Sequence, residues 1–270
     1  MFWFLLCAFG VVAGVTTVLF GFGGGFVAVP LLFTLISVSH APGSAIGEAA
    51  MHIAVATSTA AMIFGAGLST LRHARARTLQ WPVVRPLLGY VALGAVLGAW
   101  AATQVQGAWI RWLFIGYLGL TILDAVLRPG FTVSTSDGMR PLGRRASAVI
   151  GVGMGAVAAF LGVGGSVMSV PLMRRRGASM AVATASANPL SLPMAIAGTA
   201  AYAVLAWRTE VLGPWFAGYI DVRALAVLVL GSWCGIRLAA PWIGRMPDAL
   251  HVKCYLALLG VVLVVMVVAD

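Results

Sequence analysis

The sequence predicts an all-α polytopic membrane protein built from two inverted-topology repeats of about five helical segments each, with broken or re-entrant helices at two glycine clusters. Three observations predict this fold: an apolar composition, ten apolar runs, and a glycine-rich motif that occurs once in each half. Of the 270 residues, 61% are hydrophobic and 9% are charged, whereas a soluble domain is about 25% charged. So few charges cannot cover a water-facing surface, and we expect the helices to lie in a lipid bilayer.

The apolar runs are separated by glycine, proline and charged residues. A helix rises about 1.5 Å per residue and needs roughly 20 apolar residues to cross the hydrocarbon core. The second and seventh runs are too short for this, and each follows a glycine cluster that breaks the preceding helix. The ten predicted segments are Phe2–Leu19, Phe26–Val38, Glu48–Leu71, Pro82–Thr103, Trp109–Leu127, Ser147–Leu161, Val167–Met173, Ser179–Ala206, Tyr219–Ala240 and Leu250–Val268.

The second half of the chain repeats motifs of the first half. GFGGGFVAVPL at residues 21–31 matches GVGGSVMSVPL at residues 162–172, and AVAT at 54–57 recurs at 181–184. Two matches in the same order favour an internal duplication. We therefore divide the chain into a first membrane repeat (1–128), a cytoplasmic linker (129–146) and a second membrane repeat (147–270).

Basic residues gather in alternate loops, although the net charge of +10 could also suggest a nucleic-acid partner. A nucleic-acid surface needs basic residues clustered on a solvated face, so no such partner is expected, and the loop pattern predicts the cytoplasmic side of a cell membrane. An odd number of segments in each half inverts the second half and puts both termini outside. The cytoplasmic set is Arg72, Arg75, Arg77, Arg128, Arg140, Arg144, Arg145, Arg174, Arg175, Arg176, Arg245 and Lys253; the opposite set is Arg111, Arg208 and Arg223.

The glycine clusters are the predicted substrate site. Non-helical backbone at membrane depth must line a cavity or be buried in protein, and each cluster precedes a short helix whose first amides and dipole favour an anion. Glycines also let membrane helices pack closely, which is our interpretation of Gly65, Gly67, Gly94 and Gly98. The predicted substrate-binding backbone comprises Gly23, Gly24, Gly25 and Phe26 in the first half, and Gly164, Gly165, Ser166 and Val167 in the second.

Polar side chains follow each cluster on the next segment. Thr57 and Ser58 in the first half, and Thr184, Ser186 and Asn188 in the second, are candidate hydrogen-bond donors to the anion. The alternative is that these side chains bond their own helix or a neighbouring one.

Few ionisable or metal-ligating residues lie inside the predicted segments. His52 is a candidate for proton coupling, with Glu48 one helical turn earlier as its partner; the alternative is a polar residue near the outer interface. Cys7, Cys234 and Cys254 lack metal-ligand spacing, so we expect small buried hydrophobes, no metal and no cofactor.

These motifs resemble those of the TauE/SafE sulfite exporter family. The resemblance rests on residues 21–25 leading to 29–31, on the degenerate copy at 162–172, and on the Ala-Thr-Ser element at 56–58. It implies an α-helical transporter of sulfite, sulfoacetate or related small anions. One departure is Ser166, which replaces the third glycine of the second copy and adds a hydroxyl to that side, so we expect one asymmetric site.

The predicted function is a secondary transporter, an exporter of a small anion such as sulfite, sulfoacetate or another organosulfonate, working by alternating access. Its expected partners are the anion, the bilayer and protons as a candidate coupling ion. An anion channel is the first alternative, since it would differ only in flux without coupling. An intramembrane enzyme would use Ser166 as nucleophile and His52 as base, but no third partner or oxyanion motif accompanies them, so the protein is not expected to be an enzyme.

Overall fold

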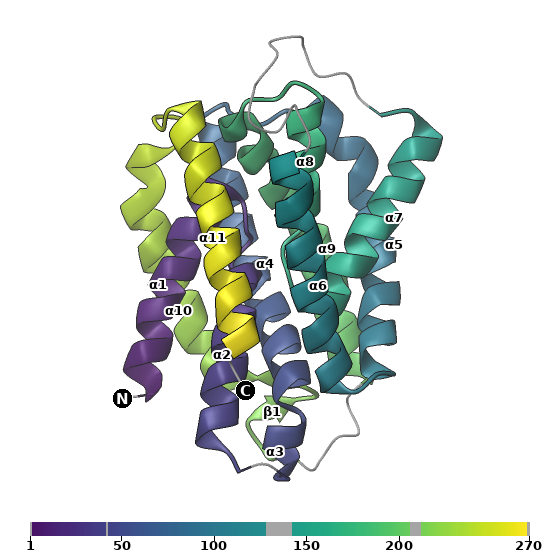
Figure 1. The fold of residues 1–270 in the computed structure, drawn as a ribbon, viewed down its shortest axis with the longest axis vertical. Coiled ribbons are helices and arrows are strands. Elements are labelled where there is room, and N and C mark those ends of the chain that lie inside the picture. The colour runs from purple at the N-terminus through teal and green to yellow at the C-terminus, as the bar shows by residue number, and fades with distance from the viewer. Residues whose placement is uncertain (1, 42, 128–141, 206–211, 269–270) are drawn as a thin grey trace.

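The computed structural model describes residues 2–41, 43–127, 142–205 and 212–268, which form a bundle of roughly parallel and antiparallel helices (Figure 1). Within these residues, eight helices are long and apolar enough to cross a membrane. The helices are α1 (Phe2–Phe20), α2 (Gly25–Ser39), α3 (Ala45–Glu48), α4 (Ala50–Arg75), α5 (Trp81–Thr103), α6 (Gly107–Leu127), α7 (Arg144–Leu161), α8 (Ser166–Arg175), α9 (Met180–Leu205), α10 (Val222–Ala239), η2 (Ala240–Trp242) and α11 (Asp248–Val268), and the strands are β1 (Phe216–Ala217) and β2 (Ile220–Asp221).

The two short helices start inside the bundle. Helix α1 enters from the end where the chain begins, and α2, with 15 residues, returns toward that same end (Figure 1). Helix α7 enters from the opposite end, and α8, with 10 residues, returns toward it (Figure 1). Pro30 and Pro171 lie inside these two helices, as the sequence predicted.

The predicted segments match the observed helices to within a few residues, but two starts need correction. The third segment was expected to begin at Glu48, whereas Glu48 ends the separate four-residue helix α3. The ninth was expected to begin at Tyr219, which instead joins the two strands of a short antiparallel hairpin with Phe216 opposite Asp221. Helix α10 begins only after Asp221 because that carboxylate accepts hydrogen bonds from two amides of the first turn.

Close helix contacts cross between the two halves of the sequence. Helix α10 packs on α1 so tightly that a Cβ on Gly235 would lie 2.0 Å from the Val11 carbonyl oxygen. Helix α5 packs equally closely on α7, since a Cβ on Gly98 would lie 2.0 Å from the carbonyl oxygen of Ala156. Gly98 and its neighbour Gly94 are therefore packing glycines, as expected. The two halves interleave instead of forming separate bundles.

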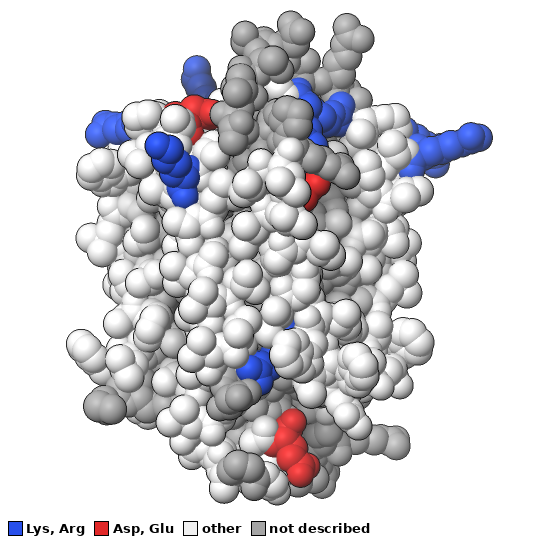
Figure 2. Space-filling view, viewed as in Figure 1, with Lys and Arg blue, Asp and Glu red and all other residues white. Residues whose placement is uncertain are grey.

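On the face drawn in Figure 2, the charged side chains of the described residues lie toward the two ends of the molecule. Figure 2 shows Lys and Arg gathered at the end that carries α8, above a broad belt of uncharged surface. The helix segments Arg72–Arg75 and Arg174–Arg175 end there, and α7 begins there at Arg144. Residues 129–141 of the predicted linker lie outside the described residues, as do Arg128 and Arg208.

The cysteines correct one expectation. Cys7 and Cys234 were expected to be buried, but both are exposed, and Cys254 is half-buried. Their helices, α1 and α10, turn these faces to the outer surface of the bundle. An apolar thiol is tolerated there because lipid surrounds such a surface.

Candidate functional site

Two breaks in the helices, residues 21–24 and 162–165, lie at the centre of the structure. In the first, Gly21, Gly23 and Gly24 adopt φ angles of 76°, 68° and 94°, which only glycine adopts without strain. In the second, Gly162 has φ 70° whereas Gly165 has φ −60°. Helices α2 and α8 begin directly after the breaks, so their first-turn amides lack carbonyl partners within the helix.

The two breaks touch each other through backbone atoms. A Cβ added to Gly164 would lie 2.4 Å from the carbonyl oxygen of Phe22, and one added to Gly25 would lie 2.6 Å from the carbonyl oxygen of Gly162. Real Cβ atoms essentially never come so close. Glycine is thus required here because backbone of one half occupies the space beside backbone of the other.

Side chains of α4 and α9 bind the second break. The Ser191 hydroxyl accepts a hydrogen bond from the Gly165 amide at 3.0 Å and donates to the Ala187 carbonyl at 3.1 Å. The Ser58 hydroxyl lies 2.9 Å from the Val55 carbonyl and 3.3 Å from the Gly162 carbonyl. These contacts place the second break against the middle of both long helices.

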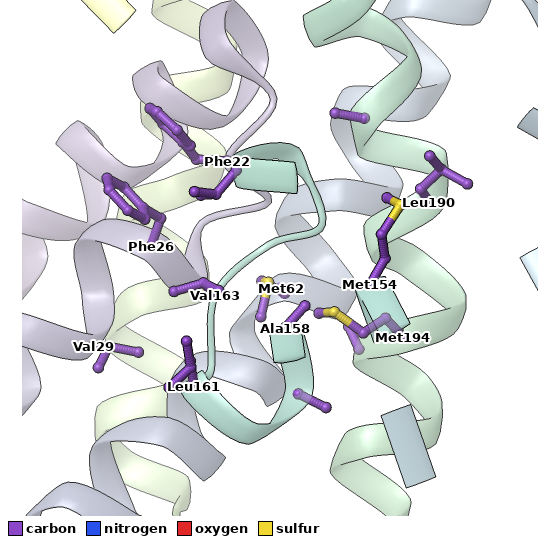
Figure 3. Packing of buried hydrophobic residues seen from close by; sticks show 14 of the residues in the cluster. Phe22, Phe26, Val29, Met62, Met154, Ala158, Leu161, Val163, Leu190 and Met194 are labelled. Carbon is purple, nitrogen blue, oxygen red and sulfur yellow. The ribbon is translucent and has the colours of Figure 1, made fainter. Parts of the chain in front are cut away.

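Aromatic and sulfur-containing side chains surround the breaks. The ring centroids of Phe22 and Phe26 are 4.4 Å apart, and Phe22 also stacks on Tyr255 at 5.1 Å. Figure 3 shows Phe22 and Phe26 on one side of the second break and Met62 close to Val163 on the other. All five residues except Val163, which is 1% exposed, are fully buried. The breaks therefore lie among buried and largely apolar side chains.

Some of the predicted polar side chains bond other protein atoms, and others have no hydrogen-bond partner among the described residues. The Thr184 hydroxyl donates to the Met180 carbonyl of its own helix at 2.8 Å, as the alternative interpretation expected. The Thr57 hydroxyl accepts from the Asp221 amide at 3.0 Å and thus contacts the hairpin rather than the breaks. Ser166 and Ser186 are buried, and their hydroxyls have no hydrogen-bond partner among the described residues.

Asn188 uses one end of its amide and leaves the other unpaired. Its Nδ2 donates to the carbonyls of Thr17 at 3.2 Å and Thr184 at 3.4 Å. Its Oδ1 is buried and has no partner in the described part of the chain. Asn188 therefore joins α9 to the end of α1 just before the first break and offers an acceptor beside it.

The predicted pair of His52 and Glu48 is not brought to the breaks. The His52 ring lies 3.0 Å from the Val105 carbonyl through Nε2 and stacks on Tyr219 at 5.1 Å. Glu48 is exposed in α3 at the end of the bundle. Both residues lie toward the hairpin end rather than in the centre.

Several central residues were not identified from the sequence. Ser191 follows Thr184 and Asn188 at helical spacing, a signal that could have placed all three on one face. Gly65 was interpreted as a packing glycine, yet a Cβ there would lie 2.8 Å from the carbonyl oxygen of Gly23 in the first break. His73 had no sequence signal, but its Nε2 lies 2.8 Å from the Val18 carbonyl.

Known proteins resemble this chain over nearly its full length. The family model described as "Sulfite exporter TauE/SafE" matches residues 6–267. A "Probable membrane transporter protein" of Haemophilus influenzae is 26% identical over 247 residues, covering 90% of each chain, and "Probable membrane transporter protein YdhB" of Bacillus subtilis is 24% identical, covering 83% of each. "Probable membrane transporter protein MamO" of Paramagnetospirillum magneticum is 23% identical over 64% of this chain and 34% of its own. No solved structure matches. The match confirms the family resemblance: the chain belongs to the sulfite exporter TauE/SafE family and is a multi-pass membrane transporter protein.

Proposed function

We propose that the protein is a secondary transporter that exports a small anion such as sulfite, sulfoacetate or another organosulfonate by alternating access. The observation that carries this proposal is the contact between two glycine breaks, each followed by the amino-terminal end of a half-helix. Amides of Gly23–Phe26 and Gly164–Val167 would then hold the anion without a formal positive charge. The Gly165 amide donates to the Ser191 hydroxyl while the breaks are in contact, so it would have to leave that hydroxyl to bind the anion. Half-helices that meet at the membrane centre are typical of substrate sites in secondary transporters.

Unpaired side-chain groups support an anion at this place. A buried polar group without a partner costs free energy, so the Ser166 and Ser186 hydroxyls are stabilised when a ligand accepts their hydrogen bonds. The free Oδ1 of Asn188 is an acceptor and suits a ligand oxygen that carries a proton. Singly protonated sulfite would satisfy all three groups, whereas a sulfonate would pair with the two hydroxyls only.

The close contact of the breaks supports a mechanism with movement. The Phe22 carbonyl occupies the space beside Gly164, so an anion enters only if the two breaks separate. Separation toward one end of the bundle at a time is alternating access. With the two breaks in contact, the molecule would be in the closed state of that cycle.

Recurring spacings support the inverted repeat. Gly10, Gly14 and Gly21 precede Gly151, Gly155 and Gly162 by the same 141 residues. Gly14 contacts Ser232 of α10, and Gly155 contacts Val91 of α5, both through carbonyl oxygens. The same helix pair would thus occur twice, once as α1 with α10 and once as α7 with α5.

The packing favours moving units that differ from the sequence halves. Rocking one half against the other would break the backbone contacts of α1 with α10 and of α5 with α7. Those contacts recur along each pair, at Gly14 and Gly235 for α1 with α10 and at Gly98 and Gly155 for α5 with α7. Each pair is therefore better suited to move as a unit. We therefore propose that the α1–α10 pair and the α5–α7 pair move relative to α4 and α9.

Flux through purified protein in liposomes tests this function. We expect saturable flux of sulfite or sulfoacetate, and countertransport, in which unlabelled anion inside accelerates uptake of labelled anion. Flux that rises linearly with concentration and shows no countertransport would indicate an anion channel. Undiminished flux after the double substitution Gly24→Leu and Gly165→Leu would contradict the site.

We also propose that the basic end of the bundle faces the cytoplasm of the cell and that both termini lie outside. The test replaces the three native cysteines by alanine and places one cysteine at Ala41, near the hairpin end, or at Ala76, at the basic end. Both positions are exposed. A membrane-impermeant maleimide should label Ala41→Cys but not Ala76→Cys in intact cells, and the reverse pattern would overturn the orientation.

A further inference from the structure

Two histidines bind the end of α1 immediately before the first break. The last carbonyls of a helix have no partner within it. The Val18 carbonyl lies 2.8 Å from Nε2 of His73, and the Leu19 carbonyl lies 2.8 Å from Nε2 of His251. Because carbonyl oxygens only accept hydrogen bonds, Nε2 of each ring must carry the proton. Two side chains from distant helices thus fix the residues that lead into Gly21.

We propose that His73 and His251 form a proton-binding site that controls the end of α1 and couples anion movement to a proton. This inference rests on the proposed transport function and identifies its coupling ion and coupling residues. Histidine is the side chain whose charge changes near neutral pH. A protonated ring donates a stronger, charge-assisted hydrogen bond to a helix carbonyl. Proton binding would therefore hold the end of α1 in place, and proton release would free it to move.

The surroundings of His73 satisfy both of its protonation states. Its Nδ1 lies 2.9 Å from the Thr78 hydroxyl, and that hydroxyl also lies 3.3 Å from the His73 carbonyl. In the neutral ring, Nδ1 accepts the hydroxyl proton. In the protonated ring, Nδ1 donates to the hydroxyl oxygen, and the hydroxyl donates to the carbonyl instead. One threonine can thus serve either state without leaving a buried group unpaired.

A small cavity joins the two rings to the predicted substrate segment. It has a volume of about 10 Å³, which is about the space of one water molecule. Both histidines line it together with Thr184 and Trp242, and they are the titratable residues of its lining. Thr184 in turn lies against the first break, since a Cβ on Gly21 would lie 2.4 Å from the Thr184 carbonyl.

An ion pair lies beside His251. Asp248 lies one helical turn before His251, and it pairs with Arg174 of α8, whose Nη2 is 3.0 Å from the carboxylate. The Asp248 carboxylate also accepts a hydrogen bond from the Met180 amide at 2.6 Å. The two charges act on the His251 ring in opposite senses, and His73 lies between Arg72 and Arg75 in the last turn of its own helix. We expect the two rings to bind protons one after the other.

The corresponding place in the second half cannot bind a proton in this way. The Ala159 carbonyl lies 141 residues after the Val18 carbonyl, and it accepts a hydrogen bond from the Tyr202 hydroxyl at 2.9 Å. A tyrosine stays neutral where histidine titrates. The proposed site therefore acts at one break only, and Tyr202→Phe is a matched control.

The first test measures the protons directly and needs no substrate. The chain contains four histidines, so nitrogen NMR of ¹⁵N-histidine-labelled protein in lipid nanodiscs resolves each ring, with assignment by single histidine-to-glutamine substitutions. Between about pH 5 and about pH 8, we expect His73 and His251 to change protonation state and each midpoint to shift when the other ring is replaced. Rings that keep one state throughout this range would overturn the proposal, even if anion transport is established.

The second test measures coupling in liposomes. Sulfite changes its own charge near neutral pH, so this test uses methanesulfonate, whose charge is constant. An imposed pH gradient should accelerate wild-type flux several-fold, and the ratio of fluxes with and without the gradient should fall to about one in the double variant His73→Gln, His251→Gln. Glutamine keeps an N–H donor for the carbonyls and so preserves the fold. Tyr202→Phe and His52→Gln should retain the wild-type ratio.

The outcomes separate the two proposals. Flux without any response to the gradient in the wild-type protein, or a full response in the double variant, would overturn proton coupling at these residues and leave the transporter standing. Absence of saturable flux for every anion would contradict the proposed function. The NMR titration would then still decide whether the two rings bind protons.

Discussion

The carbonyl oxygen of Phe22 lies where a side chain on Gly164 would begin, 2.4 Å from its hypothetical Cβ. The two residues are far apart in the sequence and belong to opposite halves, yet their backbones are in contact. A transporter with a central site needs two such surfaces that meet and separate. The glycine at 164 makes the closed contact possible.

A matched pair of glycine substitutions tests this contact. Gly164→Ala should lower the free energy of unfolding by about 1–3 kcal/mol, because the added methyl group overpacks against the Phe22 carbonyl. The same variant should reduce anion flux at least tenfold. Gly67→Ala in α4 should retain both stability and flux, because the nearest atom to its Cβ would be the end of the Leu192 side chain, 3.7 Å away. Equal flux in the two variants, measured in liposomes beside thermal unfolding in detergent, would contradict the account.

Ser191 should be more important for stability than another buried serine on α8. Ser191→Ala leaves the Gly165 amide without its acceptor and should lower the free energy of unfolding by about 1–3 kcal/mol. Ser169→Ala should change it by less than about 0.5 kcal/mol, because the Ser169 hydroxyl has no partner among the described residues. A comparable loss in both variants would mean that the Ser191 bond does not hold the second break.

Ser186 should affect substrate affinity and not folding. A hydrogen bond from a hydroxyl to an anion is worth about 1.5–3 kcal/mol, so Ser186→Ala should raise the KM for the anion about tenfold or more with little change in unfolding. Thr184→Val is the control, since the Thr184 hydroxyl bonds its own helix, and its KM should be unchanged. If KM rises for Thr184→Val but not for Ser186→Ala, the anion lies elsewhere along α9.

Two ion pairs near the basic end should differ in strength. Arg174 is buried, and its partner Asp248 is 36% exposed. Asp248→Asn should therefore lower the free energy of unfolding by about 2–3 kcal/mol, which is less than the loss for a fully buried pair. Asp124 pairs with Arg175, and both side chains are about one-third exposed. Asp124→Asn should therefore lower the free energy of unfolding by less than about 1 kcal/mol. Unfolding curves of the two variants in the same detergent provide the comparison. The reverse order would show that burial does not set the strength of these pairs.

The helices and breaks could be predicted from the sequence because local rules determine them. Apolar length identified the spanning segments, and the glycine clusters with Pro30 and Pro171 identified the two short helices. The pairing of α1 with α10 and of α5 with α7 was not predicted. It depends on which small residues of distant helices face one another, and Gly94 and Gly235 carry no mark of their partners in the sequence.

Short motifs were also misleading about register. The AVAT matches set Thr57 against Thr184, two residues in different structural settings. By contact, Thr184 faces Gly21 at the first break, and Val55 faces Gly162 at the second. The positions that meet the breaks are thus 129 residues apart, whereas the AVAT motifs are 127 apart. Alanine, valine and threonine recur in any apolar helix, so a four-residue match does not determine register.

Direct observation of a bound anion tests the central claim most sharply. Selenite has the shape and charge of sulfite and scatters strongly enough to be located in a structure of the protein determined in its presence. We predict selenite density between Gly23–Phe26 and Gly164–Val167, within hydrogen-bond distance of the first amides of α2 and α8 and of the Ser186 hydroxyl. Density confined to the outer cavity beside Arg223 and His40, with the two breaks still in contact and free of anion, would contradict the account.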